Sequence, residues 1–356
     1  MASRLLLHDL HAAAGATFAA PCGAELPLHY GDAAAEYASA RQGVGLIDRS
    51  AAGVLEVTGR DRAAFLHAML SNDIKALSAG RGCAAAFLDV HGKVEVLLFV
   101  WTLEDRILLV TPPAAAEKAM QDLDKYLFSE KASFRDATGE LALLMLAGPE
   151  APAVARRLTG ASVPPDAWAH VTATLEGIDV RLVRGGGETG EPEVWVVASA
   201  GAGAPVWQAL VGAGARPVGL VARESLRIEA GTPLYGRDVD ASVLLPEIPS
   251  AHLVSSTKGC YIGQEVVVRI RDRGHVNRHL RGFLLDGETV PSPGAAVLSG
   301  ESEIGRVTSA TWSFGLKRPI ALGFVRRPQA EPGTPVAVRS PDRTTPATVS
   351  ALPFTR

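Results

Sequence analysis

The hydrophobic pattern of the chain changes at Gly274, and this change limits the folds that it can adopt. Before Gly274, strand-like segments with alternating apolar residues, such as 54–57, are mixed with segments whose apolar residues recur at helical spacing. After Gly274, short strands are predicted at roughly 280–285, 303–311, 320–325, 336–339 and 346–352, separated by Gly/Pro turns such as 291–294. We therefore expect an α+β part followed by a small all-β barrel or sandwich.

The α+β part mixes strands and helices without strict alternation, which is compatible with a ferredoxin-like unit. The sequence predicts strands at 44–48, 54–57, 84–88, 94–101, 107–110, 132–136, 141–146, 170–175, 178–184 and 194–198. It predicts helices at 33–42, after Asp61, from Pro113 to about 127, from Pro149 to 158, at 205–212 and at 219–230. A chain of 356 residues is expected to form two or three domains.

The composition is that of a soluble globular protein. It is 47% hydrophobic and 21% charged, and its formal net charge of −3 gives no overall attraction to nucleic acid. Three widely spaced cysteines, Cys22, Cys83 and Cys260, form neither a disulfide framework nor a CxxC pair, which fits a reducing compartment. The sequence shows no signal peptide and no membrane-spanning apolar run. We expect a cytoplasmic protein without a metal site or a membrane partner.

The stretch KGCYIGQE, which begins at Lys258, contains a candidate reactive side chain. Cys260 lies between Gly259 and Gly263, which allow the backbone to form a tight turn. If Gly263 caps a helix over the apolar run 266–270, the sulfur lies near the positive end of that helix. A nearby cation and a helix N-terminus both favour the thiolate. The alternative interpretation is a small hydrophobic residue in a buried turn.

Basic residues are concentrated in the same region. Between Lys258 and Arg281 there are six Lys/Arg and two acidic residues. We interpret this stretch as a solvated face or as a pocket for one anionic ligand, because few aromatic residues accompany the charges. The glycine run 185–187 lacks the lysine and the spacing of a phosphate-binding loop, and it predicts a flexible hairpin.

The KGCYIGQE stretch resembles the signature K-G-C-Y-x-G-Q-E of the YgfZ group of folate-binding proteins, which are relatives of the glycine-cleavage T-protein, an aminomethyltransferase. The similarity extends to YGDAAAEYASARQGVGLIDRS, VLEVTGRDRAAFLHAMLSNDI, LSAGRG, ARESLRIEAGTPLYGRDVD and EIGRVTSATWSFGLKRPIALGFV. It implies three domains around a central hole. The first α+β domain comprises 1–50 and 138–274 and carries the Cys260 stretch. The second α+β domain, which is ferredoxin-like, comprises 51–137. The barrel comprises 275–356.

The resemblance also implies a site in the central hole for tetrahydrofolate or a one-carbon derivative. The acid that binds the pterin ring falls on Glu191, and the folate-contacting arginine falls on Arg223. A carboxylate suits the donor edge of a pterin, and a guanidinium suits a carbonyl or anionic acceptor. Further contacts with the cofactor are expected from Glu95 and Thr111.

The T-protein has two adjacent aspartates, one implicated in aminomethyl transfer, and Glu95 and Val96 stand at these positions. Replacing the aspartate by valine removes a group expected to handle a proton. Adjacent strand residues face opposite sides of a sheet, so we expect that Glu95 does not take over at position 96. The sequence therefore predicts retained folate binding and a loss of aminomethyl transfer.

The function predicted from the resemblance is a tetrahydrofolate-binding accessory protein for assembly or repair of iron–sulfur clusters, with iron–sulfur client or assembly proteins as partners. Cys260 is its expected functional residue, and Lys258 is expected to keep the sulfur anionic. The motif is supported by Gly259, Tyr261, Gly263, Gln264 and Glu265. Two alternatives are a folate-dependent aminomethyltransferase of T-protein type and an RNA- or protein-binding module that uses residues 258–281.

Overall fold

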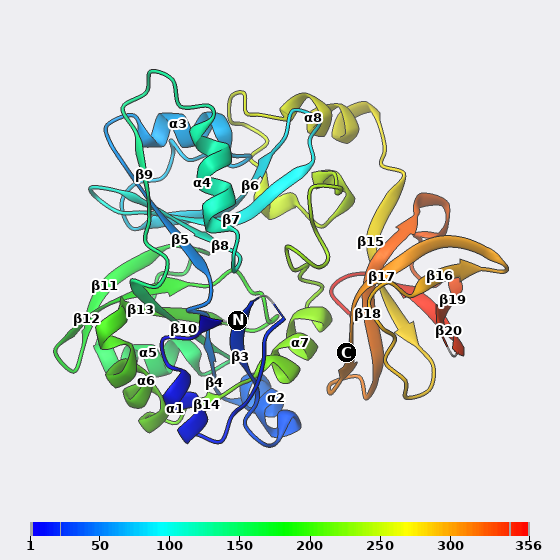
Figure 1. The fold of residues 1–356 in the computed structure, drawn as a ribbon, viewed down its shortest axis with the longest axis horizontal. Coiled ribbons are helices and arrows are strands. Elements are labelled where there is room, and N and C mark those ends of the chain that lie inside the picture. The colour runs from blue at the N-terminus through cyan, green and yellow to red at the C-terminus, as the bar shows by residue number, and fades with distance from the viewer. Residues whose placement is uncertain (1–2, 22, 342, 355–356) are drawn as a thin grey trace.

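The computed structural model of the protein describes residues 3–21, 23–341 and 343–354, so Cys22 lies outside the described residues. Two α+β bodies lie one above the other, and a closed β-barrel lies beside them across a central space (Figure 1). The predicted fold class, α+β with a C-terminal small barrel in a T-protein-like arrangement, is confirmed. The exact domain boundaries given above stay a prediction.

The lower body in Figure 1 is built on a six-stranded sheet. The strands follow the order β11 (His170–Leu175), β12 (Ile178–Arg184), β13 (Glu193–Ser199), β10 (Leu141–Ala147), β4 (Gly45–Asp48) and β14 (Arg216–Pro217). Its helices are α2 (Ala33–Gln42), α5 (Ala151–Thr159), α6 (Gly203–Gly212) and α7 (Leu220–Glu229). Strand β10 is apolar throughout because Leu144 and Leu146 pack with α5 and α6, while Leu143 and Met145 face the core shared with the upper body.

The upper body contains a five-stranded sheet. The strands follow the order β6 (Arg81–Leu88), β7 (Val94–Thr102), β8 (Ile107–Thr111), β5 (Gly53–Thr58) and β9 (Ser133–Asp136). Helices α3 (Arg62–Met69) and α4 (Ala116–Asp124) cover its outer face. Along β7, Leu98 and Val100 pack toward these helices, whereas Phe99 and Trp101 pack with the lower body. This alternation decides which β7 side chains can reach the central space.

The sequence analysis did not assign the N-terminal elements, the two-residue β14 or the 3-10 turns that follow α7. The N-terminal segment forms α1 (His8–Ala13) and a small sheet of β1 (Ser3–Arg4), β3 (Ala24–His29) and β2 (Thr17–Ala19). The buried His11 ties this segment to β4, because its Nε2 atom lies 2.8 Å from Asp48 Oδ2. The connection from α7 to the barrel contains short 3-10 turns and then α8 (Gln264–Arg273). Among the described residues, no helix is long and apolar enough to cross a membrane.

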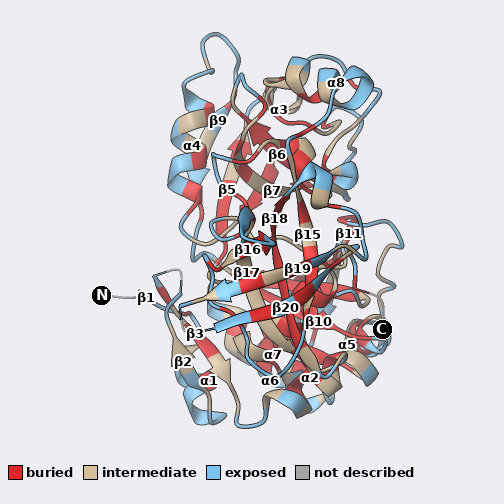
Figure 2. Ribbon diagram, turned by 90° about the vertical axis from the view of Figure 1, so that its right-hand side faces the viewer, coloured by how far each residue is buried: buried red, intermediate tan, exposed pale blue. Residues whose placement is uncertain are grey.

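The barrel closes from six antiparallel strands. They follow the order β15 (Arg278–Leu285), β18 (Arg318–Arg326), β17 (Ser302–Ser313), β16 (Ala296–Ser299), β19 (Pro335–Ser340) and β20 (Arg343–Ser350). The four-residue β16 is the one strand of the barrel that the sequence analysis did not predict. Figure 2 shows buried residues through the sheets and barrel, with exposed residues on outer helices and loops.

Arg227 on α7 fixes the barrel to the lower body. Its side chain is buried, and it donates to Asp238 Oδ2 at 2.9 Å and to Ser309 Oγ on β17 at 2.8 Å. It also pairs with Glu224 one helical turn away. Because a buried charge is stable only when paired, these contacts hold one wall of the central space in place.

Candidate active site

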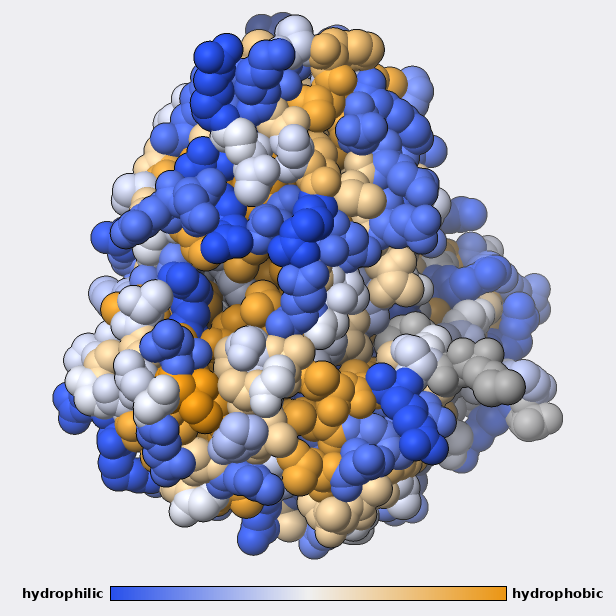
Figure 3. All heavy atoms as spheres, turned by 60° about the vertical axis from the view of Figure 1, so that its left-hand side comes forward, coloured by the Kyte–Doolittle hydropathy of each residue, from blue (hydrophilic) through white to orange (hydrophobic). Residues whose placement is uncertain are grey.

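A central pocket of about 960 Å³ lies between the two bodies and the barrel. Its lining includes Glu95, Phe99 and Thr111 from the upper body, Trp168, Glu188, Trp195 and Arg223 from the lower body, and Thr311 from the barrel. This volume is typical of pockets that hold cofactors and substrates. On the face shown in Figure 3, hydrophobic residues gather mainly in the lower half of the view, between hydrophilic residues.

Glu188 is the carboxylate at the lower-body end of the pocket, and two arginines hold it. Arg49 donates to Glu188 Oε2 at 2.5 Å, and Arg223 donates twice to Oε1, at 2.8 and 3.0 Å. Burial alone would raise the pKa of Glu188, but the charges and hydrogen bonds of Arg49 and Arg223 hold that pKa well below its usual range. Glu188 is therefore an ionised acceptor.

The glycine-rich loop that carries Glu188 is ordered by Glu193. This buried carboxylate accepts hydrogen bonds from Gly187 N at 3.0 Å and from Thr189 N and Oγ1 at 2.7 and 2.8 Å. Burial, followed by the nearby Glu188 charge, raises the pKa of Glu193. The interpretation of this segment as a flexible hairpin missed that its side chains turn back into the body and shape the pocket.

Aromatic side chains form one wall of the pocket. The rings of Phe99 and Trp168 are stacked, with centroids 3.9 Å apart, and Trp195 meets Phe99 edge to face at 6.1 Å. Trp168 has φ of 66°, a conformation that costs a bulky residue about 1–3 kcal/mol. Packing against Gly186 holds it there, since a Cβ on Gly186 would lie 2.5 Å from the indole.

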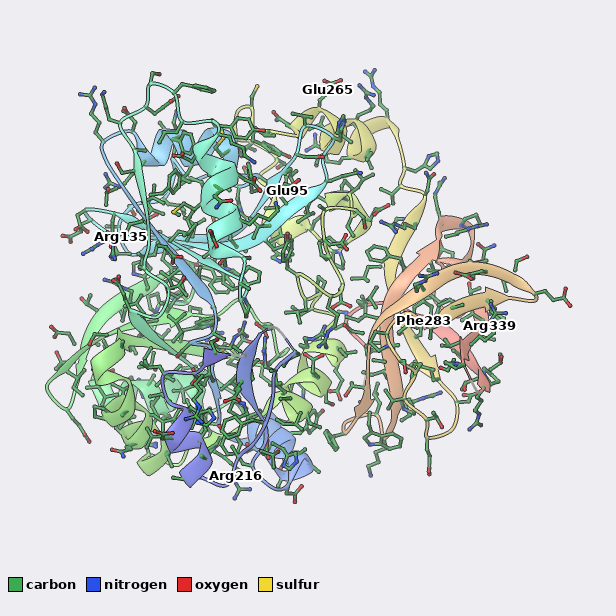
Figure 4. All side chains as sticks on the ribbon, in the orientation of Figure 1. Glu95, Arg135, Arg216, Glu265, Phe283 and Arg339 are labelled. Atoms are coloured by element: carbon green, nitrogen blue, oxygen red, sulfur yellow. The ribbon has the colours of Figure 1, made fainter. Side chains whose placement is uncertain are left out.

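Glu95 is the carboxylate at the upper-body end of the pocket. Figure 4 shows it on β7, on the side of the upper body that faces the central space. Lys118 Nζ on α4 donates to Glu95 Oε2 at 2.5 Å, and the Tyr235 hydroxyl donates to the Glu95 backbone oxygen. Val96 points away and is buried in the core beneath the outer helices.

The structure brings three of the four predicted cofactor contacts into the pocket: Glu95, Thr111 and Arg223. Glu191 is not part of the lining, and its Oε1 accepts from Arg41 Nη1 at 2.7 Å. The neighbouring Glu188 lines the pocket instead, and sequence reasoning missed it. No spacing signal distinguishes the two glutamates, because the course of the loop decides which of them points inward.

The signature stretch lies outside the pocket, at the top of the molecule where Figure 4 labels Glu265. Lys258 is buried, and its ammonium donates to the carbonyls of His67, Leu70 and Asn72, the last at 3.1 Å. These carbonyls lie at the C-terminal end of α3, where backbone acceptors need donors. Burial lowers the pKa of Lys258 to about 8. The lysine charge therefore acts on α3.

The other residues of the stretch shape a turn. Gly263 has φ of 78° and is the N-cap of α8, as the sequence analysis expected. Cys260 is exposed, and the Tyr261 ring lies 4.9 Å from Lys258 Nζ. At the start of α8, which Gln264 begins, Glu265 pairs with Arg269 at 2.5 Å.

Several basic residues beyond this point also have protein partners. Arg271 pairs with Asp272, Arg278 with Glu247, and Arg281 donates to the Ala330 carbonyl. Within the described parts of the chain, no group of three or more His, Cys, Asp and Glu side chains is placed to hold a metal ion.

Comparison with known proteins identifies the family. The description of the GCVT N-terminal domain matches residues 7–258, and that of the glycine cleavage T-protein C-terminal barrel domain matches residues 278–355. The chain therefore belongs to the glycine cleavage T-protein family.

The relatives match over almost their whole length. The aminomethyltransferase of Streptomyces avermitilis is 33% identical over 98% of this chain and 96% of its own, and one from Thermus thermophilus is 34% identical over 98% and 97%. The crystal structure of the glycine cleavage system aminomethyltransferase T from Bartonella henselae has a TM-score of 0.91 and 26% identity, and covers 100% of this chain and 98% of that one.

These comparisons correct the predicted function. The relatives are named aminomethyltransferases and not YgfZ proteins, so the predicted role in iron–sulfur cluster assembly or repair through Cys260 is wrong, and the aminomethyltransferase alternative is supported. The prediction that aminomethyl transfer is lost is wrong for the same reason. The prediction relied on the acid that is missing at Val96. The position that faces the pocket is Glu95, which keeps a carboxylate.

Proposed function

We propose that the protein is a folate-dependent aminomethyltransferase that binds tetrahydrofolate, or a one-carbon derivative, in the central pocket. The observation that carries this proposal is the pocket carboxylate Glu95, in a chain with near-full-length similarity to proteins named aminomethyltransferase. The cytoplasmic location predicted from the composition is part of the proposal. The KGCYIGQE stretch supports a narrower placement in the YgfZ group, which stays a prediction separate from the pocket chemistry.

The lower-body end of the pocket suits the flat, polar ring of a folate. Such a ring requires aromatic side chains to pack against and a few directed polar contacts. The aromatic pair Phe99 and Trp168 provides the packing surface. Glu188 offers an acceptor, because a carboxylate has about four lone-pair sites and the two arginines use three of them. We assign the ring contact to Glu188 instead of Glu191, and keep Arg223 and Thr111 as further contacts.

The upper-body end suits the chemical step. Transfer of a one-carbon unit to a folate nitrogen requires that the nitrogen lose a proton as the new bond forms. Among the described residues, Glu95 Oε2 has Lys118 as its partner, while Oε1 has none. Oε1 can therefore accept a hydrogen bond from the reacting nitrogen and take up its proton.

The test is the formation of methylenetetrahydrofolate from tetrahydrofolate and an aminomethyl-lipoyl carrier protein. We expect the wild type to catalyse it and Glu95→Gln to lower kcat by about 10²–10⁴-fold, because the amide cannot accept a proton. Glu117→Gln is the matched control, since Glu117 lies on α4 outside the pocket lining. Absence of transfer by the wild type would refute the proposal.

A further inference from the structure

We propose that Lys118 is a positioning residue for this transfer: it holds the Glu95 carboxylate by one oxygen and leaves the other available to the reacting nitrogen. The inference rests on the proposed function and adds to it a residue from α4, outside the strand that carries the acid.

Lys118 is itself held in place from the other side. Its Nζ atom lies 2.5 Å from Glu95 Oε2 and 2.5 Å from Asp122 Oδ2, one helical turn along α4. Lys125 lies 2.6 Å from the second oxygen of Asp122. The four side chains thus alternate in charge from the helix surface to the pocket, and this alternation fixes the ammonium beside Glu95.

The backbone at Glu95 is fixed as well. The Tyr235 hydroxyl, on the connection that follows α7, donates to the Glu95 carbonyl oxygen. Main chain and carboxylate are therefore held by two different elements, the 3-10-rich connection and α4. A catalytic group whose position is set from two sides needs little reorganisation when the substrate arrives.

The contrast with Glu188 shows what this arrangement provides. Arg49 and Arg223 engage both oxygens of Glu188, so it is suited to anchor a ligand. Lys118 engages one oxygen of Glu95, so the other can exchange a proton. One pocket thus holds a carboxylate with both oxygens held and one acceptor site left for a ligand at one end, and a carboxylate held by a single oxygen at the other.

The ion pair of Lys118 contributes little to folding stability. Its side chain is 54% exposed, and exposed ion pairs contribute about 0–1 kcal/mol to stability. Burial opposes its charge, but hydrogen bonds and charges from Asp122 and Glu95 raise its pKa, so the ammonium persists. An ion pair that adds little to folding yet touches the pocket acid is suited to a positioning role.

Kinetics of three variants test the inference. In Lys118→Met we expect kcat for transfer to fall about tenfold, with KM for tetrahydrofolate and the melting temperature unchanged, because only the orientation of Glu95 is lost. Lys118→Arg restores the ion pair and is expected to recover kcat to within about threefold of wild type. Lys131→Met is the matched control, because Lys131 is an exposed lysine of the upper body outside the pocket lining, and it is expected to behave as wild type.

A crystal structure of Lys118→Met provides a readout that does not depend on activity. We expect the Glu95 carboxyl group to leave its wild-type position or to become disordered. Unchanged kcat in Lys118→Met, an equal loss in Lys131→Met, or a Glu95 carboxyl that stays in place would each overturn the inference. If the wild type shows no transfer, the proposed function fails, and the position of Glu95 in this crystal structure still decides whether Lys118 positions it.

Discussion

Glu95 and Val96 are neighbours on β7, yet Glu95 lines the central pocket and Val96 is buried in the core on the opposite face of the sheet. Successive side chains of a strand point to opposite faces of the sheet, so the two residues must lie on different sides. The alternation does not tell which residue points into the pocket. That assignment needs the packing of α3 and α4 on one face and the lower body on the other. The position that faces the pocket therefore keeps an acid, although the neighbouring position does not.

The first prediction concerns Glu188. Glu188→Gln removes the carboxylate that pairs with the largely buried Arg49 and Arg223, and we expect the free energy of unfolding at pH 7 to fall by about 3 kcal/mol. The pKa of Glu188 is lower in the folded than in the unfolded protein, so its contribution is present above about pH 4.3 and is lost as pH falls further. Urea unfolding between pH 7 and pH 3 measures the difference.

The matched control for this variant is Glu140→Gln. Glu140 pairs with Arg135 at the exposed surface, so its loss is expected to cost about 0–1 kcal/mol. Two results would contradict this prediction. One is a Glu188→Gln protein that is no less stable than Glu140→Gln. The other is a difference in unfolding free energy between wild type and Glu188→Gln that grows toward pH 3.

Sequence patterns predicted much of the fold because each element has a local signal. Strand alternation placed β5 to β8, and turn signals placed five strands of the barrel. Strand β16 and the N-terminal elements were missed, because they are short and are stabilised by neighbours. His11, for example, is held by Asp48, 37 residues away, and no local pattern can report such a contact.

The site was less predictable than the fold. A resemblance supplied Arg223, Thr111 and Glu95, which lie in the pocket, but it favoured Glu191 over Glu188. Which glutamate points inward depends on the hydrogen bonds that Glu193 makes to the loop. The role predicted for the signature failed for another reason, since a distinctive motif indicates relatedness and does not show what the motif does.

The second prediction concerns Lys258. Lys258→Met removes the donors for carbonyls at the end of α3, and we expect about 2 kcal/mol of destabilisation at pH 7. The pKa of Lys258 is about 8 when folded and about 10.4 when unfolded, so the unfolded chain binds more protons between these values. Wild-type stability relative to the variant is therefore expected to rise with pH from about 8 to 10.

Lys75→Met is the control, because Lys75 is exposed and lies in the same region of the upper body. Chemical denaturation of the three proteins at pH 7, 8, 9 and 10 gives the comparison. The account of Lys258 fails if its variant shows the same pH trend as Lys75→Met.

The third prediction concerns Cys260. The sulfur is exposed, and the stretch that carries it does not line the pocket. Cys260→Ser is therefore expected to retain kcat and KM for aminomethyl transfer to within about twofold, in contrast to Glu95→Gln, which removes the proposed proton acceptor. A tenfold loss of kcat in Cys260→Ser would show that the sulfur takes part in the transfer.

The fourth prediction separates two roles of Gly263. Its φ of 78° disfavours any side chain, and a Cβ there would lie 2.5 Å from the Asp89 carbonyl oxygen on the β6–β7 turn. Gly263→Ala thus adds a clash to the left-handed penalty of about 1–2 kcal/mol, and we expect a total loss of about 3 kcal/mol.

Gly177 provides a matched comparison on the β11–β12 turn. It has φ of 82° and no atom within 4 Å of an added Cβ, so Gly177→Ala carries the conformational penalty alone. The difference between the two variants in urea unfolding then measures the contact between the signature turn and the upper body. Equal losses would mean that Asp89 moves aside at no cost, and that Gly263 is required for its backbone conformation and not for close packing.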